Sequence, residues 1–192
     1  MKHRFTLRAA ALVVFALPLL QGCFPLAVTG MAAGAMMAAD RRTTGTYIED
    51  EGIEIKAISA LKEVNERGAH VNVTSYNRRA LLTGEVPTEE LRKKAEDAMA
   101  AVPQVREVIN ELQIAGPSSM AARGNDALIT SNVKARMVNN PKFSVNHIKV
   151  LTEANTVYLM GLVTPTEADA AVEVARTTQG AQRVVKVFEY LK

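Results

Sequence analysis

The chain contains two copies of one sequence pattern, and this internal repeat restricts its fold more than any other feature. Val71 aligns with Ile148 and Gly84 with Gly161, both at an offset of 77 residues, and the match continues without a gap to the end of the chain. Two copies are too few for a solenoid, in which many repeats stack into one continuous core. The sequence therefore predicts two domains of one kind.

The segment between the copies contains Gly, Pro and Ser in succession, which is typical of a linker. We expect the first domain to cover residues 46–115, the linker residues 116–124 and the second domain residues 125–192.

Each copy begins with an amphipathic helix. In the first copy the apolar residues that recur at helical spacing are Ile53, Ala57, Ala60, Leu61 and Val64. In the second copy they are Ile129, Val133 and Met137. Asn125 or Asp126 is expected to cap the start of the second copy's helix, and Asn139-Asn140-Pro141 is expected to end it.

The rest of each copy predicts a hairpin, a second helix and a last strand. The hairpins cover residues 71–84 and 148–161. The second helices follow 87–90 and 164–167, where Thr and early acidic residues mark a helix start, and the last strands are 105–114 and 183–191. Each copy therefore has the element order αββαβ, which is an α+β fold.

A glycine occupies the same place late in the second strand of both copies. Glycine weakens a strand unless backbone must approach closely or bend. We therefore assign Gly84 and Gly161 a structural role and expect the second helix to cross tightly at these positions.

The first 22 residues have the pattern of a signal peptide: Lys2, Arg4 and Arg8 precede an uncharged apolar run. The run ends in Leu20-Gln21-Gly22-Cys23, which resembles a bacterial lipobox. That resemblance implies that residues 1–22 are removed and that Cys23, the only cysteine, carries acyl chains such as palmitate. The alternative is a signal anchor or a spanning helix, since the apolar stretch is long enough for a bilayer.

Residues 23–45 are interpreted as the acylated N-terminus and a tether. Residues 24–39 are rich in Gly, Ala and Met, and either lie on the membrane surface or act as a flexible tether. Residue 24 is Phe rather than Asp, which implies transfer to the outer membrane in species that sort lipoproteins by this residue.

Charge gives no support for nucleic-acid binding. The formal charge of +3 comes from the three basic residues of the predicted signal peptide, so the mature chain is near neutral. The two copies nevertheless differ, because residues 40–116 carry 11 basic and 14 acidic residues and residues 117–192 carry 9 basic and 6 acidic. Only the second copy suits an anionic surface.

The repeat resembles the BON domain. The resemblance is carried by Val71-x-Val73, Leu82-x-Gly84-x-Val86 and the run Val105 to Leu112, which reads Val-x-x-Val-x-Asn-x-Leu. The second copy departs from this last pattern, with Val187 in place of Asn and Glu189 in place of Leu. The family implies two tandem domains, each a three-stranded mixed sheet packed against two helices.

With the lipobox and two copies, the chain is similar to the dual-BON outer-membrane lipoproteins. That similarity implies a non-enzymatic protein without cofactors, anchored by lipid to the outer membrane and facing the periplasm. It also implies binding of anionic phospholipid such as phosphatidylglycerol or cardiolipin, with a role in membrane integrity and at the division site, where envelope or division proteins are further partners. The first helix of the second domain is the implied contact.

The sequence of that helix shows a second, weaker apolar stripe away from the core. On a helical projection the stripe and its flanking cation comprise Leu128, Ser131, Lys134, Ala135 and Val138. Two interpretations are open: contact with lipid, or packing against the first copy in an adaptor that binds another envelope protein.

No motif of a catalytic, metal or phosphate site occurs. His70 and His147 lie near the first strand of each copy and are interpreted as surface or strand-edge residues, and Glu96 and Glu173 as solvated. No Cys/His/Asp/Glu group has the spacing of metal ligands, so we expect no metal site.

Overall fold

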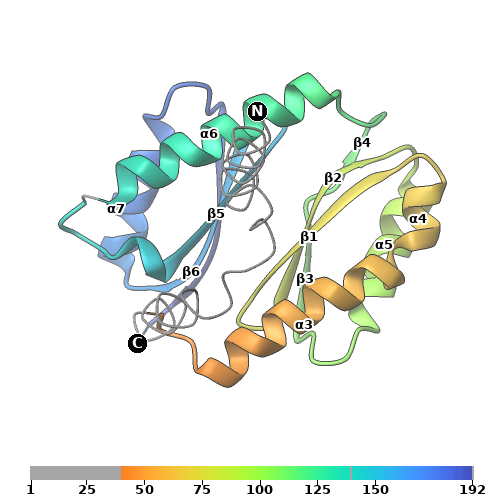
Figure 1. Cartoon of the computed structure of the whole chain (residues 1–192), viewed down its shortest axis with the longest axis horizontal. Helices are drawn as coiled ribbons and strands as arrows, with labels where there is room; N and C mark the ends of the chain where they lie inside the picture. Colours follow the sequence, from red (N-terminus) through yellow and green to blue (C-terminus); the bar gives the residue numbers. More distant parts are fainter. Residues whose placement is uncertain (1–39, 139, 192) are drawn as a thin grey trace, which may run out of the picture. The chain divides into compact units, whose positions relative to one another are not determined.

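The computed structural model describes residues 40–138 and 140–191, so the predicted signal peptide, Cys23 and the tether up to residue 39 lie outside it. The first repeat contains α3 (Thr44–Ala60), α4 (Lys62–Glu66), β1 (His70–Tyr76), β2 (Arg79–Val86), α5 (Glu89–Ala100), β3 (Glu107–Asn110) and β4 (Gln113–Ile114). The second contains α6 (Met120–Val138), η2 (Val145–His147), β5 (Ile148–Glu153), β6 (Thr156–Val163), α7 (Pro165–Arg176) and β7 (Arg183–Tyr190) (Figure 1). No helix in this part of the chain is both long and apolar enough to cross a membrane.

Both repeats have the predicted mixed sheet. The middle strand, β2 or β6, pairs antiparallel with the strand before it and parallel with the strand after α5 or α7. In the first repeat the last strand is interrupted, and β3 and β4 pair with β2 one after the other. Thus the αββαβ order is confirmed, with α4 and the divided last strand as local variations.

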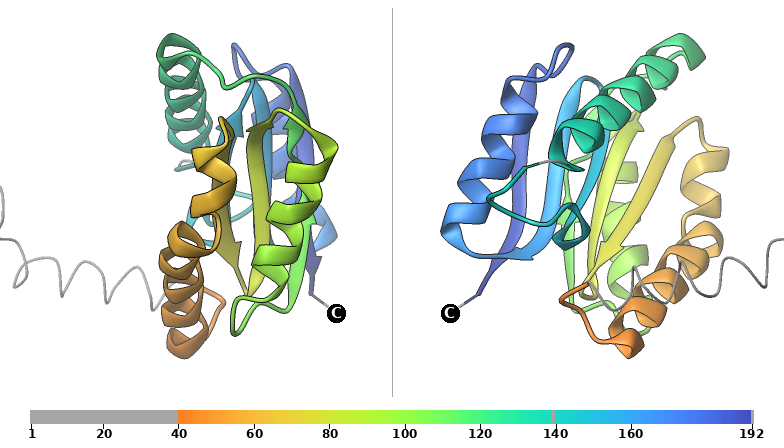
Figure 2. Two further views of the ribbon diagram at one scale, coloured as in Figure 1. Left: turned by 90° about the vertical axis from the view of Figure 1, so that its right-hand side faces the viewer. Right: turned by 60° about the vertical axis from the view of Figure 1, so that its left-hand side comes forward.

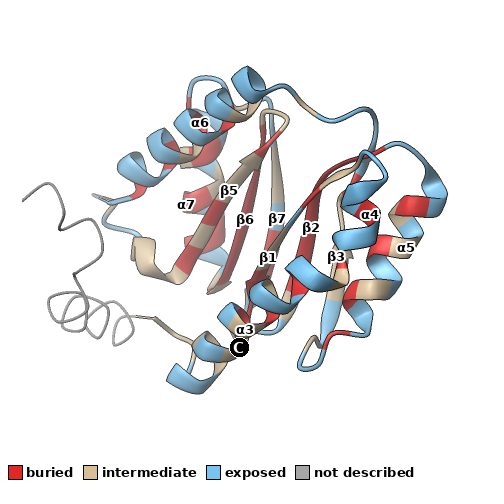
Figure 3. Ribbon diagram, turned by 45° about the vertical axis from the view of Figure 1, so that its right-hand side comes forward, coloured by how far each residue is buried: buried red, intermediate tan, exposed pale blue. Residues whose placement is uncertain are grey.

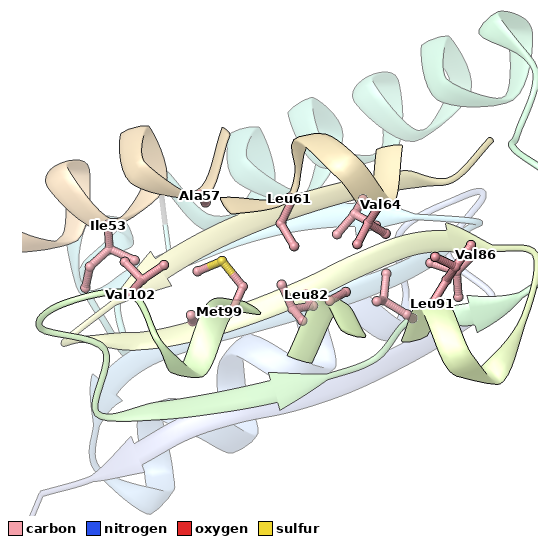
Figure 4. Packing of buried hydrophobic residues seen from close by; sticks show 13 residues of the cluster. Ile53, Ala57, Leu61, Val64, Leu82, Val86, Leu91, Met99 and Val102 are labelled. Carbon is pink, nitrogen blue, oxygen red and sulfur yellow. The ribbon is translucent and has the colours of Figure 1, made fainter. Parts of the chain in front are cut away.

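Each repeat has its own core between one face of its sheet and its helices (Figure 2). In the first repeat α3, α4 and the residue between them contribute Ile53, Ala57, Leu61 and Val64, which meet Leu82 of β2 and Met99 of α5 (Figure 4). In the second repeat Ile129, Val133 and Met137 of α6 are buried in the same way. The helical periodicity therefore identified the core faces of both leading helices.

The start of α6 differs from the prediction. Neither Asn125 nor Asp126 caps this helix, which begins at Met120 and so includes part of the expected linker. The Ser119 hydroxyl accepts a hydrogen bond from the Ala122 N–H at 3.1 Å, which is the bond expected of a helix cap.

Asp126 instead fixes the hairpin turn between β5 and β6. Its carboxylate accepts hydrogen bonds from the N–H groups of Ala154 and Asn155 at 3.0 and 2.9 Å. Both turn residues have positive φ, 48° and 58°, as a two-residue type I′ turn requires. Asp50 does the same in the first repeat, where it accepts from Asn77 and Arg78.

The two strand glycines are needed, but not because of a helix. A Cβ on Gly84 would lie 2.0 Å from the carbonyl oxygen of His70, and one on Gly161 would lie 2.4 Å from that of His147. Gly84 also has a φ of +110°. The close approach is therefore to the first strand of the same hairpin, and the expected tight crossing of the second helix is wrong.

The described residues all belong to one compact unit, in which the sheets pack against each other on the faces that the helices leave free. The apolar contact joins Tyr76 and Leu81 of the first repeat to Tyr158, Met160 and Val187 of the second. At its edges Lys149 forms an ion pair with Glu54 at 2.7 Å, and Asn72 donates to Glu153 at 2.8 Å.

Candidate functional site

The outer face of α6 is open in the structure. Figure 3 shows exposed residues along the side of α6 that is turned away from its sheet. The five residues singled out from the sequence are all exposed, and the two large apolar ones, Leu128 and Val138, are 66% and 62% exposed. Because the repeats meet through their sheets, the alternative in which this face packs against the first repeat is wrong.

The face is less polar than its sequence indicates. The Ser131 hydroxyl donates to the carbonyl oxygen of Ala127 at 2.9 Å, so its hydrogen-bonding capacity is used within the helix. The additional first turn contributes Met120, which is 79% exposed, together with exposed Ala121 and Ala122. These three residues were missed because the sequence placed them in the linker.

The charged residues of α6 are mostly basic. Its only acidic residue, Asp126, is buried and bonded to the turn, whereas Lys134 is exposed and forms no ion pair within the described residues. Arg136 is held differently, since its guanidinium donates to the Val174 carbonyl and to the Thr177 and Thr178 hydroxyls of the second repeat. Lys134 is therefore the exposed cation of this surface that the described residues leave without an ion pair.

The equivalent helix of the first repeat also exposes apolar side chains. Ile48, Ile55 and Ile58 of α3 are 60%, 66% and 74% exposed. Their spacing of seven and three residues places them on one side of the helix, a signal that was available in the sequence. This stripe differs from that of α6 because exposed Glu51 lies beside it.

The segment before α3 is bound to both repeats rather than acting as a tether. Arg41 donates to the Leu162 carbonyl at 2.8 Å and forms an ion pair with Glu167 at 2.7 Å. Arg42 forms an ion pair with Asp50 at 2.7 Å, and its guanidinium lies 4.0 Å from the ring centroid of Tyr76. Residues 40–43 are called the strap below.

The strap has an electrostatic effect on the second repeat. The hydrogen bond from Arg41 lowers the pKa of Glu167 to about 2, although burial of the carboxylate opposes this shift. Glu167 is held in addition by the N–H and hydroxyl of Thr164, with which it forms a capping box at the start of α7.

A group of possible metal ligands lies between the repeats. His70, Glu85 and Glu153 place one ligand atom each within 4.8 Å of one another. They come from β1, β2 and β5, so their separation in the sequence gave no sign of a site. The spacing of these residue types predicted no metal site and left His70 as an isolated residue, whereas the fold brings three side chains of metal-ligating type together.

Comparison with known proteins agrees with this architecture. The BON domain family matches residues 49–116 and 125–192. The chain is 37% identical over 187 residues to the outer membrane lipoprotein DolP of Haemophilus influenzae, covering 96% of this chain and 97% of that protein.

Two further relatives are similar over most of their length. The 21 kDa hemolysin of Actinobacillus pleuropneumoniae is 33% identical, with 80% of each chain covered. The osmotically-inducible protein Y of Escherichia coli is 24% identical, with 81% of this chain and 80% of that protein covered. With two matched domains and a relative that aligns along nearly its whole length, the chain belongs to the BON domain family as a DolP-like protein with two BON domains.

Proposed function

We propose that this protein is a non-enzymatic outer-membrane lipoprotein, acylated at Cys23, whose second BON domain binds anionic phospholipid through the outer face of α6. The observation that carries the proposal is the exposed apolar stripe of Leu128, Ala135 and Val138 beside Lys134, which forms no ion pair in the described part of the chain. The similarity to an outer membrane lipoprotein supports the location. A role in membrane integrity and at the division site is proposed with it.

Two interactions would contribute to the free energy of binding between α6 and such a membrane. Burying a leucine side chain in an apolar environment contributes about 1.5–3 kcal/mol, and a lysine near an anionic surface about 1 kcal/mol. Both contributions to the binding free energy are small, so α6 alone would bind the membrane weakly and reversibly. Acyl chains at Cys23 would hold the domain near the membrane and raise its effective concentration there.

The first test measures binding of residues 40–192 to vesicles that contain phosphatidylglycerol. These residues include both cores, so they are expected to fold without the anchor. Leu128→Glu removes apolar contact and adds a repelled charge, so we expect about 2–3 kcal/mol weaker binding, or roughly 30- to 150-fold. High salt should weaken binding of the unchanged protein.

The matched control is Ile58→Glu, the same kind of change at a similarly exposed position on α3. We expect it to bind as the unchanged protein does, because α3 carries four acidic residues and one basic residue and so does not favour an anionic surface. Normal binding by Leu128→Glu, or an equal loss in both variants, would contradict a site on α6. Absence of binding by the unchanged protein would favour an adaptor for another envelope protein.

The second test concerns the anchor and uses the full chain in a bacterial host. We expect the unchanged protein to be labelled by palmitate and recovered with the outer membrane, and Cys23→Ala to lose the label. A labelled Cys23→Ala protein would exclude this cysteine as the acylation site.

A further inference from the structure

We propose that His70, Glu85 and Glu153 bind a divalent transition-metal ion, with Zn²⁺ as the best match, and that the ion links the two BON domains. His70 and Glu85 are cross-strand partners at the start of β1 and the end of β2. Glu153 is the last residue of β5 in the other domain. A site with these ligands would exist only when the two domains are paired.

Burial without charge compensation is the first argument. Glu85 and Glu153 are only 5% and 6% exposed, and neither forms an ion pair with a lysine or arginine in the described part of the chain. Buried carboxylates are costly unless a proton, a cationic side chain or a metal compensates them.

The available oxygen atoms are the second argument. Oε2 of Glu85 accepts from the Ser118 N–H at 3.1 Å and lies 3.3 Å from Nδ1 of His70. Oε2 of Glu153 accepts from the Asn72 amide at 2.8 Å. Within the described residues, Oε1 of either carboxylate accepts no hydrogen bond. Such bonds to one oxygen orient a carboxylate, as outer contacts do around metal ligands, and leave the other free to bind.

An open cleft gives the ion a path. The cleft has a volume of about 520 Å³, and its lining includes His70, Asn72, Glu153, Asp126 and Arg123. It has room for water, which would complete the coordination of a metal with three protein ligands. Arg123 is the cation of this cleft, and its Nε donates to the Ser118 hydroxyl at 3.2 Å.

The types of ligand atom in the group favour Zn²⁺ over the other common divalent ions. One imidazole and two carboxylates suit Zn²⁺, whereas Mg²⁺ and Ca²⁺ favour oxygen ligands alone. Zn²⁺ holds its ligand atoms at about 2.0–2.2 Å, hence about 3.4 Å apart in a tetrahedron. The three side chains would therefore close by about 1 Å on binding, a movement within reach of glutamate rotamers.

The second BON domain does not have the same group of ligands at the positions equivalent to His70 and Glu85. The positions that correspond to His70 and Glu85 are His147 and Leu162, so one carboxylate is absent there. The side chain of His147 is nearly as exposed as that of His70, 18% against 20%, which makes it a matched control.

The experiment is calorimetric titration of Zn²⁺ into untagged, metal-free residues 40–192 at neutral pH, with Co²⁺ absorption as a second measurement. We expect one ion per chain, a higher melting temperature with the ion, and at least about tenfold weaker binding in His70→Gln and Glu153→Gln. His147→Gln should bind as the unchanged protein does. Asn72→Ala, which removes only an outer contact, should weaken binding by about 10-fold or more.

No binding at micromolar Zn²⁺ by the folded, unchanged protein would overturn the proposal, as would unchanged affinity in both ligand variants. A larger loss in His147→Gln than in His70→Gln would place any bound ion elsewhere and also overturn it. None of these measurements involves lipid, so their outcome is independent of vesicle binding by α6.

Discussion

At the scale of single residues, the sequence predicted those whose role follows from local periodicity. Ile53, Ala57 and Leu61 were assigned to the core because apolar spacing along a helix decides which face is buried. Asp126 was misassigned because its partners, the N–H groups of a turn in another element, are distant in the sequence. An aspartate near a helix start suggests a cap from sequence alone, and only the fold shows that its carboxylate faces a hairpin.

The turn that Asp126 supports contains an unfavourable residue, which gives a prediction. Ala154 has a φ of +48°, where an ordinary side chain costs about 1 kcal/mol and glycine costs little. Ala154→Gly should therefore raise the free energy of unfolding by up to about 1 kcal/mol, measured by urea denaturation of residues 40–192. Ala135→Gly, on the exposed side of α6, should lower it by about 1 kcal/mol. A loss of stability in both variants would contradict the positive φ at position 154.

At the scale of elements, the order and type of helices and strands were predicted, but their second packing surface was not. The middle strands contain Leu81 and Tyr158 between residues of the helix-facing cores. Such nearly continuous apolar strands are typical of sheets covered on both faces. The signal for sheet-to-sheet packing was therefore present. Which helix face remained open followed from this packing and could not be decided from the helix alone.

The strand glycines permit a prediction about hairpin geometry. Gly161→Ala would place a Cβ 2.4 Å from a backbone oxygen, so the hairpin must distort, and we expect a loss of about 2–3 kcal/mol in the free energy of unfolding. Gly124→Ala is the matched control, because nothing lies within 4 Å of a Cβ there. In the interior of α6 that change should add up to about 1 kcal/mol. Similar denaturation curves for Gly161→Ala and the unchanged protein would exclude the close approach.

At the scale of the whole described unit, the strap, the sheet contact and the residues between the repeats all join the two domains. The apolar middle strands indicated that each sheet is covered on both faces, but the residues that join the domains could not be predicted, because they depend on how the copies pair and a repeat shows only that the copies are alike. Arg41 and Arg42 illustrate the point. The sequence indicated a polar turn at the end of a tether, whereas the structure has one arginine bound to each domain. The strap is therefore fixed on the domain pair.

The strap makes stability depend on pH in a predictable direction. Glu167 has a folded-state pKa of about 2, below its ordinary value of 4.5, so its ion pair with Arg41 stabilises the folded state fully above about pH 4.5. That contribution falls as the pH decreases through about 2. Glu167→Gln should therefore lower the urea midpoint at neutral pH and make it less dependent on pH between 2 and 4.5.

Glu173→Gln is the control for this change, since Glu173 forms only an exposed pair with Arg176. The loss should also be visible locally: without its ion pair to α7, Arg41 is held in the second domain by its hydrogen bond to the Leu162 carbonyl, and the backbone amides of the strap should exchange hydrogen faster in Glu167→Gln than in Glu173→Gln. Equal exchange in the two variants would mean that Arg42 and the hydrogen bond from Arg41 to Leu162 hold the segment. The ion pair of Arg41 with the second domain would then contribute nothing to holding the strap in place.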